Sequence, residues 1–224
     1  MEKSRQRFVG KKDLVVTPLI QLSLLLSSIA ISFLIDRSFY QLRILEFIVV
    51  TYVNLMILTL IILKLIRLLF PFKEGTFTES NQPNEIYIWN LYGFLCFMNL
   101  TLFFQSTLLP ILFRKFALQL LGAKIANGVF AICGNVTDPH MLVMDENVIL
   151  GDECQISSHA IITISTGDAL VVKKIHLKKN CIIGARAMLL PGVVVGEGAT
   201  VAPNIVVPMN TLIPANTHWP AHKI

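Results

Sequence analysis

A six-residue periodicity runs through the C-terminal half of the chain. Aliphatic or Met side chains recur at every sixth position, with one interruption after Ile162. The members are Met144, Leu150, Ile156, Ile162, Leu177, Ile183, Leu189, Val195, Val201, Val207 and Ile213. This spacing predicts a parallel β-solenoid in which each hexad supplies one short strand and one turn. Chance alternation in an ordinary β protein would not keep one register over so many hexads.

The first half of the chain contains two apolar segments of membrane-spanning length. Leu14 to Ile35 carries no charge, and a second run extends from about Ile44 to Leu63 and can reach Phe70. About 20 apolar residues are enough to cross a bilayer as a helix. No small-x-small cleavage site follows the first run, and the second comes straight after it. Two transmembrane helices are therefore favoured over a cleaved signal peptide or a buried helical hairpin.

Most of the basic residues that flank the two predicted helices lie on one side. Those before the first helix and after the second are Lys3, Arg5, Arg7, Lys11, Lys12, Lys64, Arg67 and Lys73. The turn between the helices holds only Arg37 and Arg43. Because cytoplasmic loops carry an excess of Lys and Arg, we expect a multi-pass protein of the inner (cytoplasmic) membrane, with both termini and the β domain in the cytoplasm.

The net charge of +5 is best explained by anionic lipid near these helices. The basic residues form no patch interleaved with aromatic residues, so no nucleic-acid partner is expected. The four cysteines show no CxxC pair and no Cys/His spacing suited to zinc, and we expect no metal. Cys154 and Cys181 occupy the small inward position of their hexads, which predicts packed, reduced thiols.

Two further segments lie between the apolar runs and the repeats. Pro71 to Glu85 is predicted to be a linker, and the aromatic-rich stretch 86–109 is nearly as apolar as a membrane span. A third crossing would move the β domain outside, so we expect a helix that lies in or dips into the membrane interface. After Pro110, Ile111 to Leu121 predicts a short amphipathic helix with Arg114 and Lys115 directed toward water or phosphate.

These patterns divide the chain into four parts. We expect a basic cytoplasmic N-terminus at 1–13, a two-helix transmembrane anchor at 14–70 and a linker with interfacial and amphipathic helices at 71–122. The β domain then occupies 123–224.

The repeat region resembles a known family. The segment Ile183-Gly-Ala-Arg-Ala-Met-Leu-Leu-Pro-Gly-Val-Val-Val-Gly-Glu-Gly-Ala-Thr-Val-Ala and the ending Ile213-Pro-Ala-Asn-Thr-His-Trp-Pro-Ala are similar to the hexapeptide-repeat acyltransferases. The order of two membrane helices, an interfacial helix, Leu-Leu-Gly-Ala-Lys-Ile and repeats also resembles one C-terminal unit of polylysine-synthetase-type enzymes. The resemblance implies a mainly β fold with a left-handed parallel β-helix. It also implies a homotrimer, acyl-CoA bound between adjacent prisms, and a His that deprotonates the acceptor.

His159 is the strongest candidate for that base. It stands in Ile156-Ser-Ser-His-Ala-Ile, at a position that also carries His in the polylysine-synthetase-type units. Many family members place their catalytic His a few residues later, where this chain reads Ile162-Thr-Ile-Ser-Thr-Gly-Asp without a His. Either His159 is the base, or the base is lost and His159 is an outward side chain with no role.

Other polar residues are weaker candidates. Asp168, the acid in the loop from Ser165 to Lys174, is a candidate to orient a His across a subunit interface, although a solvated turn aspartate is favoured. His140 and His176 are expected at the surface or at an edge.

The family resemblance places coenzyme A contacts at three positions. These are Ala185 in Ile-Gly-Ala, Pro203 in Val-Ala-Pro-Asn, and Lys223 in the tail. The first two would act through backbone and shape, and Lys223 would meet a phosphate. Pro208-Met209 stands where a Thr-Lys pair is common in the family, which weakens the phosphate contact.

We therefore predict a membrane-anchored acyltransferase, with acetyl-CoA as the favoured donor. Its acceptor would be a hydroxyl or amine of a cell-envelope or lipid-linked sugar. Two alternatives stay open: an amide-bond-forming unit that uses a carrier-bound aminoacyl donor, and a non-catalytic trimeric membrane scaffold. A zinc site of the γ-carbonic-anhydrase type is not expected, because the spacings of His140, His159 and His176 do not match that motif.

Overall fold

The computed structural model describes residues 10–39, 43–78, 80–104, 110–129, 134–165 and 167–220. These residues form two compact units. The helical unit contains the described residues of 7–72 and 82–103, and the repeat unit contains those of 73–81 and 104–224.

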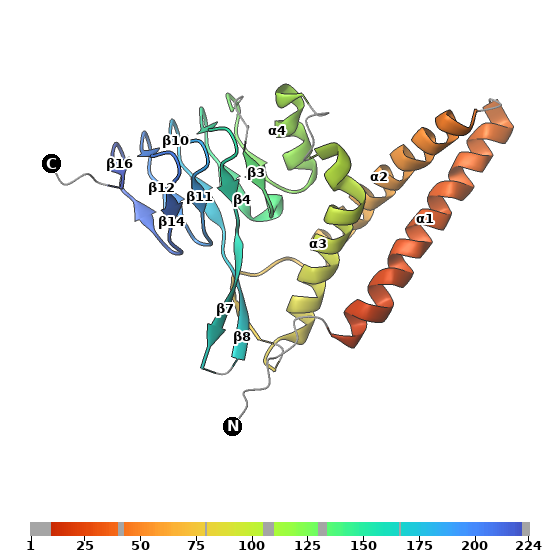
Figure 1. Ribbon diagram of the computed structural model, residues 1–224, viewed down its shortest axis with the longest axis horizontal. Coiled ribbons are helices and arrows are strands. Elements are labelled where there is room, and N and C mark those ends of the chain that lie inside the picture. The colour runs from red at the N-terminus through yellow and green to blue at the C-terminus, as the bar shows by residue number, and fades with distance from the viewer. Residues whose placement is uncertain are drawn as a thin grey trace. The chain divides into compact units, whose positions relative to one another are not determined.

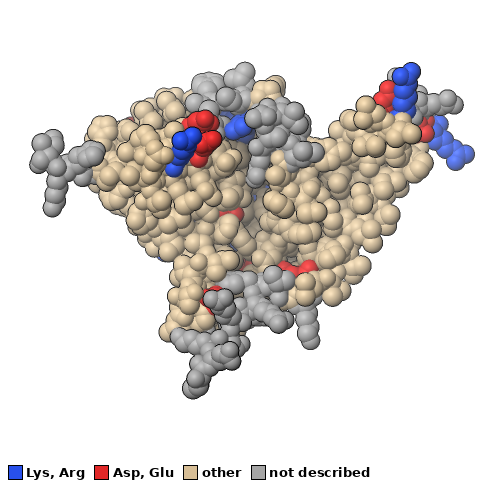
Figure 2. Space-filling model, in the orientation of Figure 1, with Lys and Arg blue, Asp and Glu red and all other residues tan. Residues whose placement is uncertain are grey.

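The helical unit consists of three helices. They are α1 (Lys11–Phe39), α2 (Ile44–Leu69) and α3 (Pro83–Phe104). Helices α1 and α2 form a long hairpin (Figure 1), and both are long and apolar enough to cross a membrane by length and composition. Between their ends, the face shown in Figure 2 carries almost no charged side chains. The prediction of two long apolar helices is confirmed.

Asn99 joins the three helices at a buried polar cluster. Its side-chain amide donates to Gln21 Oε1 on α1 (3.0 Å) and to Thr59 Oγ1 on α2 (2.9 Å). The Tyr52 hydroxyl donates to the Asn99 backbone carbonyl at 3.2 Å. Since a buried amide needs such partners, the cluster fixes α3 against both other helices. The predicted helix in this stretch is confirmed, and the side chain of Asn99 on it is buried, at 1% exposure.

Three parallel sheets form the repeat unit, and the chain visits them in rotation. The β4 sheet contains β2 (Lys124–Ile125), β4 (Leu142–Met144), β9 (Ile175–Leu177), β12 (Val194–Val195) and β15 (Leu212–Ile213). The β5 sheet contains β5 (Ile149–Leu150), β10 (Ile182–Ile183), β13 (Thr200–Val201) and β16 (His218–Trp219). The β6 sheet contains β3 (Asn135–Val136), β6 (Gln155–Ile156), β11 (Met188–Leu189) and β14 (Val206–Val207).

The six-residue period explains both the register and the core. Ile182 pairs with Thr200, and Thr200 pairs with His218, so three hexads make one turn of the chain. The periodic side chains from Ile183 to Ile213 are fully buried, as are Cys154 and Cys181. Burial raises the pKa of the Cys181 thiol to about 12. The prediction that these cysteines are packed, free thiols is confirmed.

Each hexad turn contains a residue with positive φ. The non-glycine members have φ between 54° and 60°, and are Asn147, Glu153, Asn180, Arg186, Asn204, Asn210 and Asn216. Gly192 and Gly198 continue the series at the same spacing. Asn and Gly adopt the left-handed region more readily than other residues, which explains why they recur at the turns.

One turn is replaced by an antiparallel hairpin, visible in Figure 1 as two long strands that leave the parallel sheets. Its strands are β7 (His159–Ile164) and β8 (Gly167–Val172). The prediction that Ile162 belongs to the inward hexad series is wrong, because Ile162 pairs with Ala169 in this hairpin. The regular repeat stops at Ile156 and resumes at Leu177.

Two segments outside the repeats complete this unit. The segment predicted to be a linker contains β1 (Gly75–Phe77), which pairs antiparallel with β8. The predicted amphipathic helix is α4 (Ile111–Leu120), and Leu118 packs against the buried core. Lys115 was expected to face water or phosphate, but its Nζ donates to the carbonyl of Ala126 at 2.7 Å. Helix α4 therefore covers the first strands of the repeats.

Candidate active site

The hairpin begins at the point where the turn pattern fails. Positive-φ residues recur every six positions, and His159 stands six residues after Glu153. At His159 the chain enters β7 and does not turn, and it rejoins the repeats at Ile175, the first residue of β9. His159 therefore lies at the base of the hairpin, beside the regular coils.

Asp138 lies within hydrogen-bonding distance of His159. The distance from His159 Nδ1 to Asp138 Oδ2 is 2.7 Å. The Asp138 side chain is 6% exposed, whereas that of His159 is 33% exposed. An ionised carboxylate only accepts hydrogen bonds, so Nδ1 carries the proton of this pair and Nε2 is the nitrogen suited to proton transfer.

An enlarged turn brings Asp138 to this position. Val136 and Met144 are eight residues apart, whereas the equivalent Leu189 and Val195 are six apart. The enlarged turn contains the short 3₁₀ helix η1 (Pro139–Met141), and Asp138 is its N-cap. The wider turn places a carboxylate next to the hairpin base, where the regular turns have a short solvent-exposed loop.

Further donors hold the Asp138 carboxylate in place. Its Oδ2 accepts the backbone N–H of Ser158 and the hydroxyl of Thr137, both at 3.0 Å. The Ser158 carbonyl in turn accepts the backbone N–H of Lys173 at 2.9 Å, which closes the base of the hairpin. This arrangement fixes both the orientation and the tautomer of the imidazole, as a carboxylate does in a catalytic triad.

Two opposing effects set the pKa of His159. Burial of the ring disfavours the charged imidazolium and lowers the pKa, while the hydrogen bond from the ring to Asp138 and the negative charge of Asp138 raise it. The net result is a pKa above the ordinary value for histidine. A base with a raised pKa takes up a proton more readily from an acceptor group.

The other candidate residues lie elsewhere. Asp168 is in β8 opposite Thr163, whose hydroxyl donates to Asp168 Oδ1 at 2.8 Å, whereas His159 lies opposite Val172 at the other end of the hairpin. Within this chain, therefore, Asp138 and not Asp168 is paired with His159. His176 lies on β9, where its Nε2 is 3.1 Å from Asp145 Oδ1. His140 lies in η1.

The positions expected to contact coenzyme A are brought together in part. Ala185 and Pro203 occupy the same turn on successive coils, and the backbone N–H of Asn204 donates to the Ala185 carbonyl at 2.9 Å. The turn with Ala185 and Pro203 comes just before the strands of the β6 sheet in the chain. Asp138 and His159 come just after strands of that same sheet. Lys223 lies outside the described residues.

Sequence reasoning missed Asp138. It stands before the periodic region, and its partner is 21 residues away along the chain. A weak signal exists in Thr137-Asp-Pro-His, because Asp before Pro favours a turn. The pairing itself depends on the enlarged turn and the hairpin, which both depart from the period of six.

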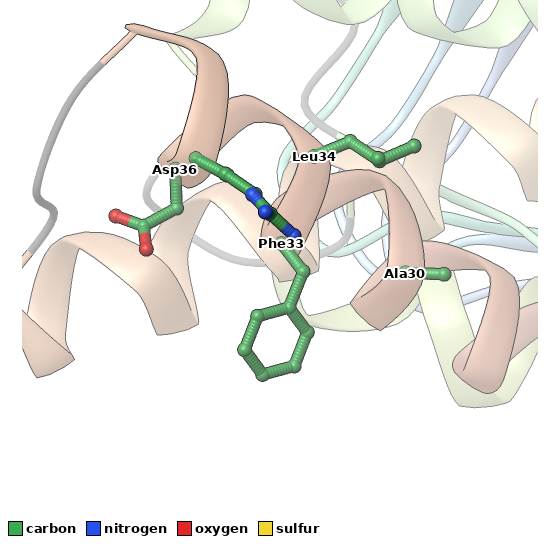
Figure 3. Close-up of a pocket in the computed structure, with 5 residues that line it drawn as sticks. Ala30, Phe33, Leu34 and Asp36 are labelled. Carbon is green, nitrogen blue, oxygen red and sulfur yellow. The ribbon is translucent and has the colours of Figure 1, made fainter.

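Two hollows lie in the helical unit. One, of about 730 Å³, is lined by Ala30, Phe33, Leu34, Asp36 and Arg37 near the end of α1 (Figure 3). A second, of about 440 Å³, is lined mainly by apolar residues of α2 and α3, with Asn84 and Glu85. Neither lining includes a histidine or a cysteine. Among the residues that the structure describes, no group of three or more His, Cys, Asp or Glu side chains could hold a metal ion.

Comparison with known proteins gives partial structural matches. No family model matches the chain, and no curated protein matches it. A hexapeptide-repeat acetyltransferase from Vibrio cholerae, solved with acetyl coenzyme A, matches at 20% identity and a TM-score of 0.38. That match covers 43% of this chain and 54% of the other, so the chain spans about half the length of that protein.

Two other solved structures match in the same way. A maltose O-acetyltransferase from Clostridium difficile 630 matches at 15% identity and a TM-score of 0.45, over 65% of this chain and 90% of the other. AntD, an N-acyltransferase from Bacillus cereus solved with dTDP and 3-hydroxybutyryl-CoA, matches at 13% identity and a TM-score of 0.32, over 47% and 83%.

Proposed function

We propose that this protein is a membrane-anchored acyltransferase. It transfers an acyl group from acyl-CoA, with acetyl-CoA as the favoured donor, to a hydroxyl or amine of a cell-envelope or lipid-linked sugar. The observation that carries the proposal is the contact between His159 and the buried Asp138 at the base of the hairpin. The hexapeptide motifs that follow it in the sequence support the same conclusion.

The geometry supports general base catalysis. Asp138 holds the Nδ1 proton of His159, so Nε2 takes the proton of the acceptor as its oxygen or nitrogen attacks the thioester carbonyl. When the carbon–sulfur bond breaks, the imidazolium returns that proton to the departing thiolate. The Asp138 carboxylate stabilises the positive charge that forms on the ring between these two steps.

We further propose that the three sheets close into a left-handed prism and that three copies associate. Outward-facing apolar side chains on the strands support this association, since Leu212 is 68% exposed, Val206 57% and Ile149 43%. Acyl-CoA would lie beside the turn of Ala185 and Pro203, with Lys223 near a phosphate. Native mass spectrometry in detergent should give a trimer, and monomer alone at micromolar concentration would refute the association.

The topology proposed is two crossings with the repeat unit in the cytoplasm. Residues 73–81 before α3 and residues 104–224 after it belong to the same unit, and β1 is hydrogen-bonded to β8. We propose that the segments before and after α3 both lie on the cytoplasmic side, so that α3 enters the membrane without a complete third crossing. Cysteine labelling tests this topology: a Glu197→Cys variant that reacts with an impermeant reagent in intact cells would overturn it.

Transfer from labelled acetyl-CoA to a membrane lipid extract tests the proposed activity. Purified full-length protein in nanodiscs should label an acceptor, and His159→Ala should abolish most of the labelling. A parallel assay with an aminoacyl group on a carrier protein tests the amide-bond-forming alternative. If the wild-type protein binds no acyl-CoA and transfers from neither donor, the non-catalytic scaffold takes the place of this proposal.

A further inference from the structure

A strand from the linker between α2 and α3 reaches the hairpin that carries His159. Strand β1 begins at Gly75, six residues after Leu69, the last residue of α2. Gly75 pairs with Val172, and Val172 pairs with His159. Gly75 of the linker and His159, the candidate base, therefore flank the same residue of β8, one on each side of that strand.

A series of polar contacts also connects this linker with Asp138. Glu74 Oε2 accepts the backbone N–H of Lys174 at 3.2 Å, and Glu74 Oε1 is 3.1 Å from Lys174 Nζ. The neighbouring Lys173 N–H donates to the Ser158 carbonyl, and the Ser158 N–H donates to Asp138 Oδ2. The series therefore runs from the residue before β1 to the carboxylate that orients His159.

The hairpin depends on β1 for its stability. Two isolated strands are marginal in water, and a third strand is normally needed. Leu170, Val171 and Val172 of β8 are at most 5% exposed, so β8 has the composition of a central strand. Phe77 of β1 is 6% exposed, which shows that β1 is packed as well as hydrogen-bonded. Without β1, β8 would become an open apolar edge.

We propose that Glu74 and β1 are positioning elements of the active site. His159 keeps its productive orientation only while this linker is docked on the hairpin. This inference rests on the proposed role of His159, and it assigns a function to a segment outside the repeats.

Two substitutions in the linker test the inference, each with a matched control. Phe77→Ala removes the packing of β1, and Phe116→Ala makes the same change at a position on α4 that is 62% exposed. Glu74→Ala removes the contacts to Lys174, and Glu146→Ala removes a similar surface ion pair to Lys179. We also include Glu74→Gln, which keeps an oxygen that can accept the Lys174 N–H.

The kinetic readout separates positioning from binding. We expect Phe77→Ala to lower kcat about tenfold and Glu74→Ala to lower it a few-fold, because small misplacements of a base are costly. The KM for acyl-CoA should not change, Glu74→Gln should recover most of the loss, and both controls should match the wild type. If Phe77→Ala does not fold, Glu74→Ala and its Gln rescue decide the question.

A second readout does not depend on activity. Diethyl pyrocarbonate modifies neutral imidazole, so peptide mass spectrometry across pH follows the titration of His159 in the full chain. Among the described charged groups, Asp138 contacts the ring, Lys173 and Lys174 follow β8, and Glu74 precedes β1. In Phe77→Ala the midpoint should move down toward the ordinary value of about 6.5, as the contact with Asp138 loosens.

These readouts distinguish failure of the inference from failure of the proposed function. Wild-type kcat together with a wild-type His159 titration in Phe77→Ala or Glu74→Ala overturns the positioning role. If the wild-type protein transfers no acyl group, the titration decides alone: a midpoint that moves in Phe77→Ala but not in Phe116→Ala supports positioning, and an unchanged midpoint refutes it.

Discussion

The regular coils from Leu177 to Trp219 and the interrupted turn around His159 are built from the same hexads, but they differ in what their polar residues do. In the regular coils, each turn is short, and its positive-φ residue faces solvent or a similar turn. At the interrupted turn, a buried carboxylate, a histidine and a hairpin base are held together by hydrogen bonds. The regular part supplies rigidity, and in the proposed function the irregular part supplies the catalytic base.

This difference suggests how such a scaffold acquires a reactive group. Successive regular coils repeat the same short turn, which leaves little room for a protected polar pair. Asp138 lies in a turn with two extra residues, and His159 lies where a hairpin replaces a turn. Two departures from the period on neighbouring coils therefore create a partly buried site without disturbing the core beneath.

The largest expected effect is on stability, in the regular coils. Leu189→Ala deletes a side chain that is 0% exposed, and it should cost roughly 2–5 kcal/mol of unfolding free energy. Thermal unfolding of the full chain in detergent measures this loss. Leu120→Ala is the control, because it makes the same change on α4 at a position that is 39% exposed. Equal melting temperatures for the two variants would contradict the assigned core.

His159→Ala should lower the rate of acyl transfer and leave the stability of the fold unchanged. We expect kcat/KM to fall roughly a hundredfold or more, the usual loss when a positioned base is removed. The melting temperature and acyl-CoA binding should persist, because His159 is one-third exposed and is not part of the buried core. His218→Ala, at an exposed position on β16, is the control. Wild-type transfer by His159→Ala would place the base elsewhere.

Asp138→Asn should have a smaller effect with a distinct pH signature. His159 acts as a base only when neutral, so kcat/KM should rise with pH through its pKa, which Asp138 raises above the ordinary value. The Asn variant removes the charge and leaves the effect of burial, which lowers the pKa. We expect roughly a tenfold loss at neutral pH and an acid limb displaced to lower pH. An acid limb at the wild-type position would show that Asp138 does not act on His159.

Periodicity made one part of the fold predictable. Inward positions such as Ile183 and Leu189 recur every six residues, and this local rule needs no knowledge of distant contacts. The apolar runs of α1 and α2 were predictable for the same reason, from length and composition alone. His159 was singled out because it precedes the break in the period.

The rest depended on contacts between distant segments. Asp138 meets His159 across 21 residues, and β1 meets β8 although the linker shows no strand pattern of its own. Ile162 is aliphatic, as the six-residue period predicts for an inward position. In the structure it pairs with Ala169 in the hairpin and is not part of the repeat core. Such pairings are decided by tertiary packing, which a single period does not encode.

The smallest expected effect lies in a regular turn. Asn204 has φ of 57° and an exposed side chain, and its backbone N–H donates to the carbonyl of Ala185. Alanine in the left-handed region should cost about 1 kcal/mol, whereas glycine adopts it without steric strain. Asn204→Ala should therefore melt slightly below the wild type, and Asn204→Gly close to it. If both variants melted alike, the recurrence of Asn at these turns would need a cause other than backbone conformation, such as contact with a ligand.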